Sequence, residues 1–193
     1  FSMGRILGPA LAGVLLLISY TAPFYLFAFS AFFVILLITK QKSPPLSKSK
    51  DDLKKISLFD NRVWPFLIVS ASFGICNAAL VQTSSFYFQD VIDPNSTNFI
   101  ALASVGFMLS ALGILNGQLL IADRLQTSPG SLIRLGILFI VFSLLGVANS
   151  TSLVHIYISL FFYGLGGGML GPGISASLSL SVGKENQGSA SGF

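Results

Sequence analysis

Long apolar runs alternate with shorter polar gaps along this chain, and the runs have the length of membrane-spanning helices. A helix needs about 20 predominantly apolar residues to cross the hydrocarbon core of a bilayer. Six runs come near this length or exceed it. They cover Phe1–Tyr20, Pro23–Thr39, Trp64–Phe88, Phe99–Ala122, Leu132–Ala148 and Leu153–Val182. The pattern predicts an all-α fold, a polytopic transmembrane helix bundle with about six complete or near-complete spans.

One gap is much longer than the others. Residues 40–62 are rich in Lys and Ser and contain the pair Pro44-Pro45. We interpret this segment as a solvated linker whose lysines touch anionic headgroups. The alternative is a regulatory or lipid-binding element. The linker divides the chain into three predicted regions, residues 1–39, 40–62 and 63–193.

The basic residues lie in alternate gaps or at the edges of those gaps. The chain has 11 Lys and Arg, and all except Arg5 follow this rule. They are Lys40, Lys42, Lys48, Lys50, Lys54, Lys55, Arg62, Arg124, Arg134 and Lys184. The intervening gaps hold Asp90 and Asp93 and no basic residue. Because cytoplasmic loops carry the excess of Lys and Arg, we expect residues 40–62, 123–134 and 184–187 to be cytoplasmic. The predicted location is a bacterial inner membrane.

Composition excludes several other classes of protein. Apolar residues make up 53% and charged residues 9%, whereas soluble domains carry roughly 25% charged residues. The net charge of +4 is too sparse to indicate nucleic-acid binding. With Cys76 as its single cysteine, the chain has no internal disulfide framework. Because there is no nucleophile–base set, phosphate loop or metal-ligand cluster, we predict no enzyme activity, cofactor or bound metal.

The first apolar run carries small residues at helical spacing. Gly4 and Gly8 lie four residues apart, Pro9 follows, and Gly13 comes one turn later. Glycines at this spacing let another helix backbone approach closely, and an internal proline loosens the helix. Arg5 lies inside the same motif. The chain opens within this apolar run and stops where a new small-residue run begins, so we expect it to be a segment of a longer membrane protein.

These features resemble the major facilitator superfamily, in particular its twelve-span drug:proton antiporter branch. The segment from Gly4 to Gly13 is similar to the antiporter motif of the fifth helix in that branch, Gly-xxx-Gly-Pro-xx-Gly-Gly, with Ala12 replacing one glycine. The chain then resembles helices five to ten and the start of helix eleven. Asp123-Arg124 matches part of another family signature, although its spacing differs and the trailing basic pair is absent.

The resemblance implies transport by alternating access, with proton-coupled efflux of drug-like or other mostly apolar compounds as the particular activity. A facilitator or symporter that takes up a sugar or small metabolite is the first alternative. A non-transporting membrane scaffold is the second. The expected partners are a small-molecule substrate, protons and the lipid bilayer, with no nucleic acid, and the full-length protein is expected to be a monomer.

Several polar residues are candidates for the substrate cavity. They are Arg5, Asn77, Gln82, Ser85 and Tyr163. A cation at bilayer depth costs at least ~2.5 kcal/mol, so Arg5 needs a partner or water; the alternative is that Arg5 snorkels to the interface. For the polar side chains of the third run, the alternative to a role in the cavity is hydrogen bonding between helices. No Asp or Glu lies within the six runs, and the resemblance implies a coupling carboxylate on helix one or four.

Two further motifs concern helix packing. The fourth run carries small residues on one helical face, at Gly106, Ser110, Gly113 and Gly117. We expect this face to receive the Gly4/Gly8 face of the first run and to seal the outward side of the carrier; packing between neighbours without gating is the alternative. In the sixth run, Gly171-Pro172 repeats the Gly-Pro pattern and predicts a second hinge.

Overall fold

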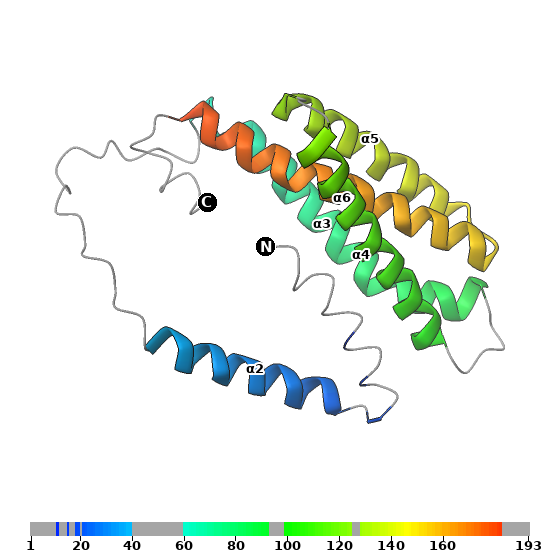
Figure 1. Ribbon diagram of the computed structural model, residues 1–193. Coiled ribbons are helices and arrows are strands. Elements are labelled where there is room, and N and C mark those ends of the chain that lie inside the picture. The colour runs from blue at the N-terminus through cyan, green and yellow to red at the C-terminus, as the bar shows by residue number, and fades with distance from the viewer. Residues whose placement is uncertain are drawn as a thin grey trace.

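The computed structural model describes residues 11, 15, 18, 19, 21–39, 60–92, 99–124 and 128–182, without the side chains of 91, 92 and 120–124. These residues form helices and no strand (Figure 1). The elements are α2 (Ala22–Thr39), α3 (Trp64–Tyr87), the π-helical turn η1 (Phe88–Ile92), α4 (Phe99–Arg124), α5 (Pro129–Ala148) and α6 (Leu153–Ser181). The predicted all-α fold is confirmed.

Five of the six expected runs correspond to these helices, and all five are long and apolar enough to cross a membrane. The observed bounds differ from the predicted ones by three residues or fewer, apart from η1, which continues α3 to Ile92. The first run, Phe1–Tyr20, lies outside the described residues except at positions 11, 15, 18 and 19. The residue types in the gaps explain where the helices begin, because polar and proline residues lie at these positions.

Short side chains and prolines start the helices. The Ser152 hydroxyl accepts a hydrogen bond from the His155 backbone amide at the first turn of α6, which satisfies one of the free amides of a helix start. α5 begins at Pro129, directly after Ser128, and α3 carries Pro65 in its first turn. Proline is tolerated there because its missing amide hydrogen has no partner in the first turn.

α6 is the central helix of the bundle. It packs against α4 on one side and α5 on the other, and α3 lies beside it with a smaller contact (Figure 1). Ile156, Leu160 and Leu170 are almost completely buried. By contrast, α2 lies apart from the other helices in Figure 1, and Pro23 is its one buried residue among those described. Its exposed phenylalanine and leucine side chains suit contact with lipid.

The α4–α6 interface brings main chains into direct contact at glycine. A Cβ atom added to Gly117 would lie 2.6 Å from the Leu165 carbonyl oxygen, and one added to Gly168 would lie 2.5 Å from the Ile114 carbonyl oxygen. At Gly164 an added Cβ would overlap the Ser110 carbonyl oxygen. Because backbone atoms line these gaps, no side-chain movement makes room for a methyl group.

The expected partner of the α4 face is therefore wrong. Gly106, Gly113 and Gly117 face α6, where an added Cβ would meet Leu160, Phe161 and Leu165 respectively. The alternative interpretation, that this face packs against a neighbouring helix, agrees with the structure. A stripe of small residues fits any helix with a complementary surface, and α6 supplies one with glycines of its own.

The α5–α6 interface follows the same principle on the opposite side of α6. Gly136 and Gly166 face each other, and an added Cβ at Gly166 would lie 2.6 Å from the Gly136 carbonyl oxygen. A buried hydrogen bond adds to the contact, since the Ser143 hydroxyl donates to the Ser159 carbonyl at 2.6 Å. Helices α4, α5 and α6 thus form one closely packed unit.

We predict that Gly164→Ala destabilises this unit. The methyl group has only the α4 main chain to displace, and overpacking of this kind costs roughly 1–3 kcal/mol. The measurement is the melting temperature of the full-length protein in detergent. Gly74→Ala on α3 is the matched control, because an added Cβ there meets nothing within 4 Å. Equal melting temperatures for the two variants would contradict close backbone packing at Gly164.

Candidate functional site

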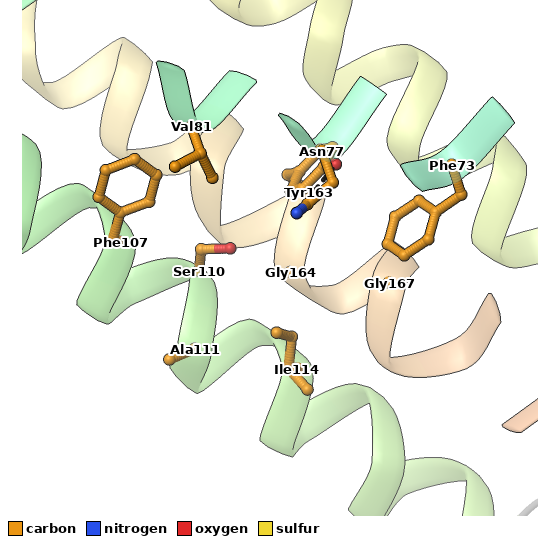
Figure 2. Close-up of a pocket in the computed structure, with 10 residues that line it drawn as sticks. All are labelled: Phe73, Asn77, Val81, Phe107, Ser110, Ala111, Ile114, Tyr163, Gly164 and Gly167. Carbon is orange, nitrogen blue, oxygen red and sulfur yellow. Dashed lines mark hydrogen bonds between the residues drawn. The ribbon is translucent and has the colours of Figure 1, made fainter. Parts of the chain in front are cut away.

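A cavity of about 310 Å³ lies between α3, α4 and α6. Figure 2 shows its lining, which comes from all three helices. The lining residues are Phe73, Asn77 and Val81 from α3, Phe107, Ser110, Ala111 and Ile114 from α4, and Tyr163, Gly164 and Gly167 from α6. Its volume is at the lower end of the range of about 300–1,000 Å³ that small-molecule sites occupy.

The cavity lies near the middle of each helix that lines it. Asn77 is close to the midpoint of α3, Ala111 is close to that of α4, and Gly167 is close to that of α6. If these helices span a membrane, the cavity therefore lies at the depth of the bilayer centre. Substrate sites of transporters built from helix bundles occupy this depth.

A small polar group occupies the centre of the lining. The Tyr163 hydroxyl donates a hydrogen bond to Asn77 Oδ1 at 3.5 Å, which links α6 to α3. Ser110 of α4 turns its hydroxyl toward these two residues in Figure 2. The cavity thus combines a few convergent polar groups with largely apolar walls, which is the usual composition of a small-molecule site.

Aromatic rings form the walls. The rings of Phe73 and Tyr163 stack with their centroids 6.2 Å apart and their planes inclined by 25°, and Phe107 lies on the α4 side. Gly167 makes room for Phe73, because an added Cβ would lie 3.2 Å from the edge of that ring. Stacked aromatic surfaces of this kind contact flat apolar molecules favourably.

No charged residue is among the described residues that line the cavity. Within the described part of the chain, no group of three or more His, Cys, Asp or Glu is placed to hold a metal ion. Asp90 is exposed on η1, at the end of α3 and away from the cavity. These lining residues therefore offer aromatic contact and neutral hydrogen-bonding groups, and no charge.

The cavity contains some of the residues that the sequence predicts, but not all of them. It brings together Asn77 and Tyr163, as well as Ser110, which we expected only in helix packing. Gln82 is exposed and Ser85 half-buried, and neither lines the cavity. Their polarity suggested a stripe, but α3 turns them to other faces.

Sequence reasoning missed most of the apolar lining. Helical spacing from Asn77 leads to Phe73 and Val81, one turn before and one turn after it. The same spacing around Ser110 leads to Phe107 and Ile114. This periodicity was the available signal. It identifies the lining only once one residue of each helix is known to face the cavity.

The structure gives less information on the two Gly-Pro motifs than on the cavity residues. α6 continues without a break through Gly171 and Pro172 to Ser181; an added Cβ at Gly171 meets nothing within 4 Å, and Pro172 is exposed. The hinge at this position stays a prediction. The segment from Gly4 to Gly13, including Arg5, Gly8 and Pro9, lies outside the described residues apart from Leu11.

A second hollow of about 270 Å³ lies between α5 and α6, lined by Phe139, Phe142, Ser143, Ser159 and Phe162. Both of its serines already donate hydrogen bonds, Ser143 to the Ser159 carbonyl and Ser159 to the His155 carbonyl. It therefore offers no free hydroxyl donor to a ligand. This difference makes the cavity between α3, α4 and α6 the stronger candidate site.

The described part of the chain holds five apolar helices, three of which line a cavity near their midpoints, as in an integral, multi-pass membrane protein. The model of the Major Facilitator Superfamily matches residues 1–193. The chain belongs to this superfamily and is a membrane transporter or a part of one. Comparisons with curated proteins and with solved structures found no match. The family confirms the coarser part of the resemblance, and the antiporter branch stays a proposal.

We predict that water reaches the cavity from one side of the membrane. In a Cys76→Ala background, which removes the native thiol of α3, Val81→Cys places a thiol in the lining. Because the thiolate is the reactive form, a membrane-impermeant thiol reagent should label it at least about tenfold faster than a thiol facing lipid. Leu138→Cys on the exposed surface of α5 is the control. Similar labelling rates at the two positions would exclude a water-filled cavity.

Proposed function

We propose that the protein exports small, mostly apolar compounds in exchange for protons, as the antiporter branch of its superfamily does. The lining of the cavity is the observation that carries this proposal. Seven of its ten residues, namely Phe73, Val81, Phe107, Ala111, Ile114, Gly164 and Gly167, have no polar side-chain atom. A ligand of this cavity thus exchanges water mainly for apolar contact.

The same lining argues against the two alternatives. A sugar carries several hydroxyl groups, and each one that loses its water without a partner weakens binding. The three polar side chains of the cavity, Asn77, Ser110 and Tyr163, are too few to replace that water. A scaffold has no need of a cavity with convergent polar groups at the centre of its spanning helices.

Alternating access gives the packed helices a mechanical role. In our proposal residues 1–39 belong to one half of the carrier, residues 63–193 belong to the other, and residues 40–62 connect them on the cytoplasmic side. The glycine contacts keep α4, α5 and α6 together as a unit. The two halves rock around the substrate site, so that the site opens to each side of the membrane in turn.

Proton coupling requires a group that binds a proton in one state and releases it in the other. No carboxylate is among the described residues that line the cavity, and we place the coupling acid in the half of the carrier that precedes α2, in line with the resemblance to the antiporter branch. One pH unit of gradient supplies about 1.4 kcal/mol per proton. This allows about a tenfold accumulation of substrate for each proton exchanged.

Transport in inverted vesicles tests the proposed direction and coupling. With an acidic lumen, vesicles that contain the full-length protein should accumulate a small neutral aromatic compound, and a protonophore should abolish the accumulation. Equilibration of the compound without accumulation, at a rate that the protonophore does not change, would point to a facilitator. Movement of glucose without movement of the aromatic compound would instead favour the uptake alternative.

Arg5 provides a second test of the proposal. If it lines the cavity, Arg5→Ala should lower the transport rate by tenfold or more without changing the amount of folded protein. Insertion of the helix should not suffer, since removing a cation from bilayer depth lowers the insertion cost by ~2.5 kcal/mol. Arg134→Ala, at an exposed position of α5, is the control. Unchanged transport in Arg5→Ala would favour the snorkelling alternative.

A further inference from the structure

The Ser110 hydroxyl differs from those of the other buried serines that the structure describes. The other four are Ser84, Ser143, Ser150 and Ser159, and each donates a hydrogen bond to a main-chain carbonyl. Ser110 is also buried, with 9% of its surface exposed, yet its hydroxyl has no hydrogen-bond partner among the described residues. Buried polar groups in folded proteins are nearly always paired, so this one is available to a ligand.

The position of Ser110 shows where a hydrogen-bond partner for its hydroxyl would lie. Its hydroxyl points into the cavity, toward the side chains that α3 and α6 contribute (Figure 2). The opposite side of this residue is fixed, because the Ser110 carbonyl oxygen contacts Gly164 of α6. The close helix contact therefore holds the main chain of Ser110 in place at the cavity wall.

Asn77 supplies a second donor from the facing wall. Its Oδ1 atom accepts the hydrogen bond from the Tyr163 hydroxyl, which orients the amide group. The Nδ2 atom then faces the cavity (Figure 2) and has no partner among the described residues. A carbonyl oxygen has two lone pairs and accepts two hydrogen bonds, so one such oxygen can satisfy Ser110 and Asn77 together.

The rest of the lining restricts the kind of molecule that can present this carbonyl oxygen. The stacked rings of Phe73 and Tyr163 present a flat aromatic surface, and Phe107 faces the cavity from α4. A flat ring makes the largest contact with such walls. A cation or anion loses its hydration here without meeting an opposite charge among the described lining residues, which makes its burial costly.

We propose that this cavity selects uncharged aromatic compounds with a carbonyl oxygen, and that Ser110 and Asn77 donate the two hydrogen bonds that recognise this oxygen. The inference rests on the proposed function, because it names the substrate class of the same site. It goes further by assigning the selection to two particular donors.

Three two-ring probes of similar size separate the contributions of the carbonyl oxygen and of charge to binding. Coumarin is neutral and carries a carbonyl oxygen, naphthalene is neutral and has none, and N-methylquinolinium carries a fixed positive charge. We expect the full-length protein in detergent to bind coumarin about tenfold more tightly than naphthalene, since two hydrogen bonds together contribute about this much. N-methylquinolinium should bind more weakly than either. The measurement is the dissociation constant of each probe by equilibrium binding.

Single substitutions test the two donors. Ser110→Ala and Asn77→Leu should each weaken coumarin binding about three- to tenfold, and Ser110→Ala should leave naphthalene binding unchanged, which also reports that the cavity is intact. Ser104→Ala is the matched control on the same helix, because the Ser104 hydroxyl already donates to the Ile100 carbonyl and lies outside the cavity lining. It should leave the binding of all three probes unchanged.

Equal affinities for coumarin and naphthalene, unchanged coumarin binding in Ser110→Ala, or tightest binding of the cation would each overturn the inference. These outcomes differ from a failure of the proposed function. If coumarin binds as expected but a proton gradient does not move it across the vesicle membrane, then proton-coupled efflux is wrong while the recognition site stands. If an aromatic compound without a carbonyl is exported while coumarin binds no more tightly than naphthalene, then proton-coupled efflux stands and the recognition site is wrong.

Discussion

Glycine carries the contacts between α6 and its two neighbours, because at these positions the main chains touch one another. Gly164 and Gly168 face α4, while Gly166 faces Gly136 of α5. In a membrane the apolar side chains gain little by leaving lipid, so helix association depends on close packing and hydrogen bonds. Two smooth surfaces on one helix allow α6 to hold both partners. Every other feature of the bundle follows from where these surfaces place α4 and α5.

The cavity is one consequence of this packing. Because α6 binds α4 so closely, Ser110, Ala111 and Ile114 face the same space as Tyr163 and Gly167. α3 closes this space from the third side and packs less extensively against its neighbours. It is held near both ends, where the Tyr87 hydroxyl donates to the Ser150 carbonyl at 2.8 Å and where Leu67 packs with the buried Val63 and Val182. The space therefore remains open at the height of Asn77.

An uncharged site suits a transporter that must release its substrate. A few hydrogen bonds and aromatic contacts give moderate affinity, whereas a buried charge would bind one class of ion and repel the other. In the proposed mechanism, coupling to protons is separated from recognition: Asn77 and Ser110 bind the substrate, and a carboxylate elsewhere in the carrier binds the proton. In this arrangement the two events communicate through movement of the packed unit of α4, α5 and α6, not through direct contact between substrate and acid.

The sequence by itself determined the helices and the class of protein. Apolar runs of spanning length can be recognised without tertiary information, because the bilayer requires each span to bury its own backbone polar groups. Asn77 and Tyr163 were also predictable as cavity residues, since polar side chains in apolar helices need a partner. Only the tertiary structure decided which helix covers the Gly106–Gly117 face and that Ser110 turns to the cavity. A small-residue face is compatible with many partners, and the choice depends on the shapes of two surfaces in three dimensions.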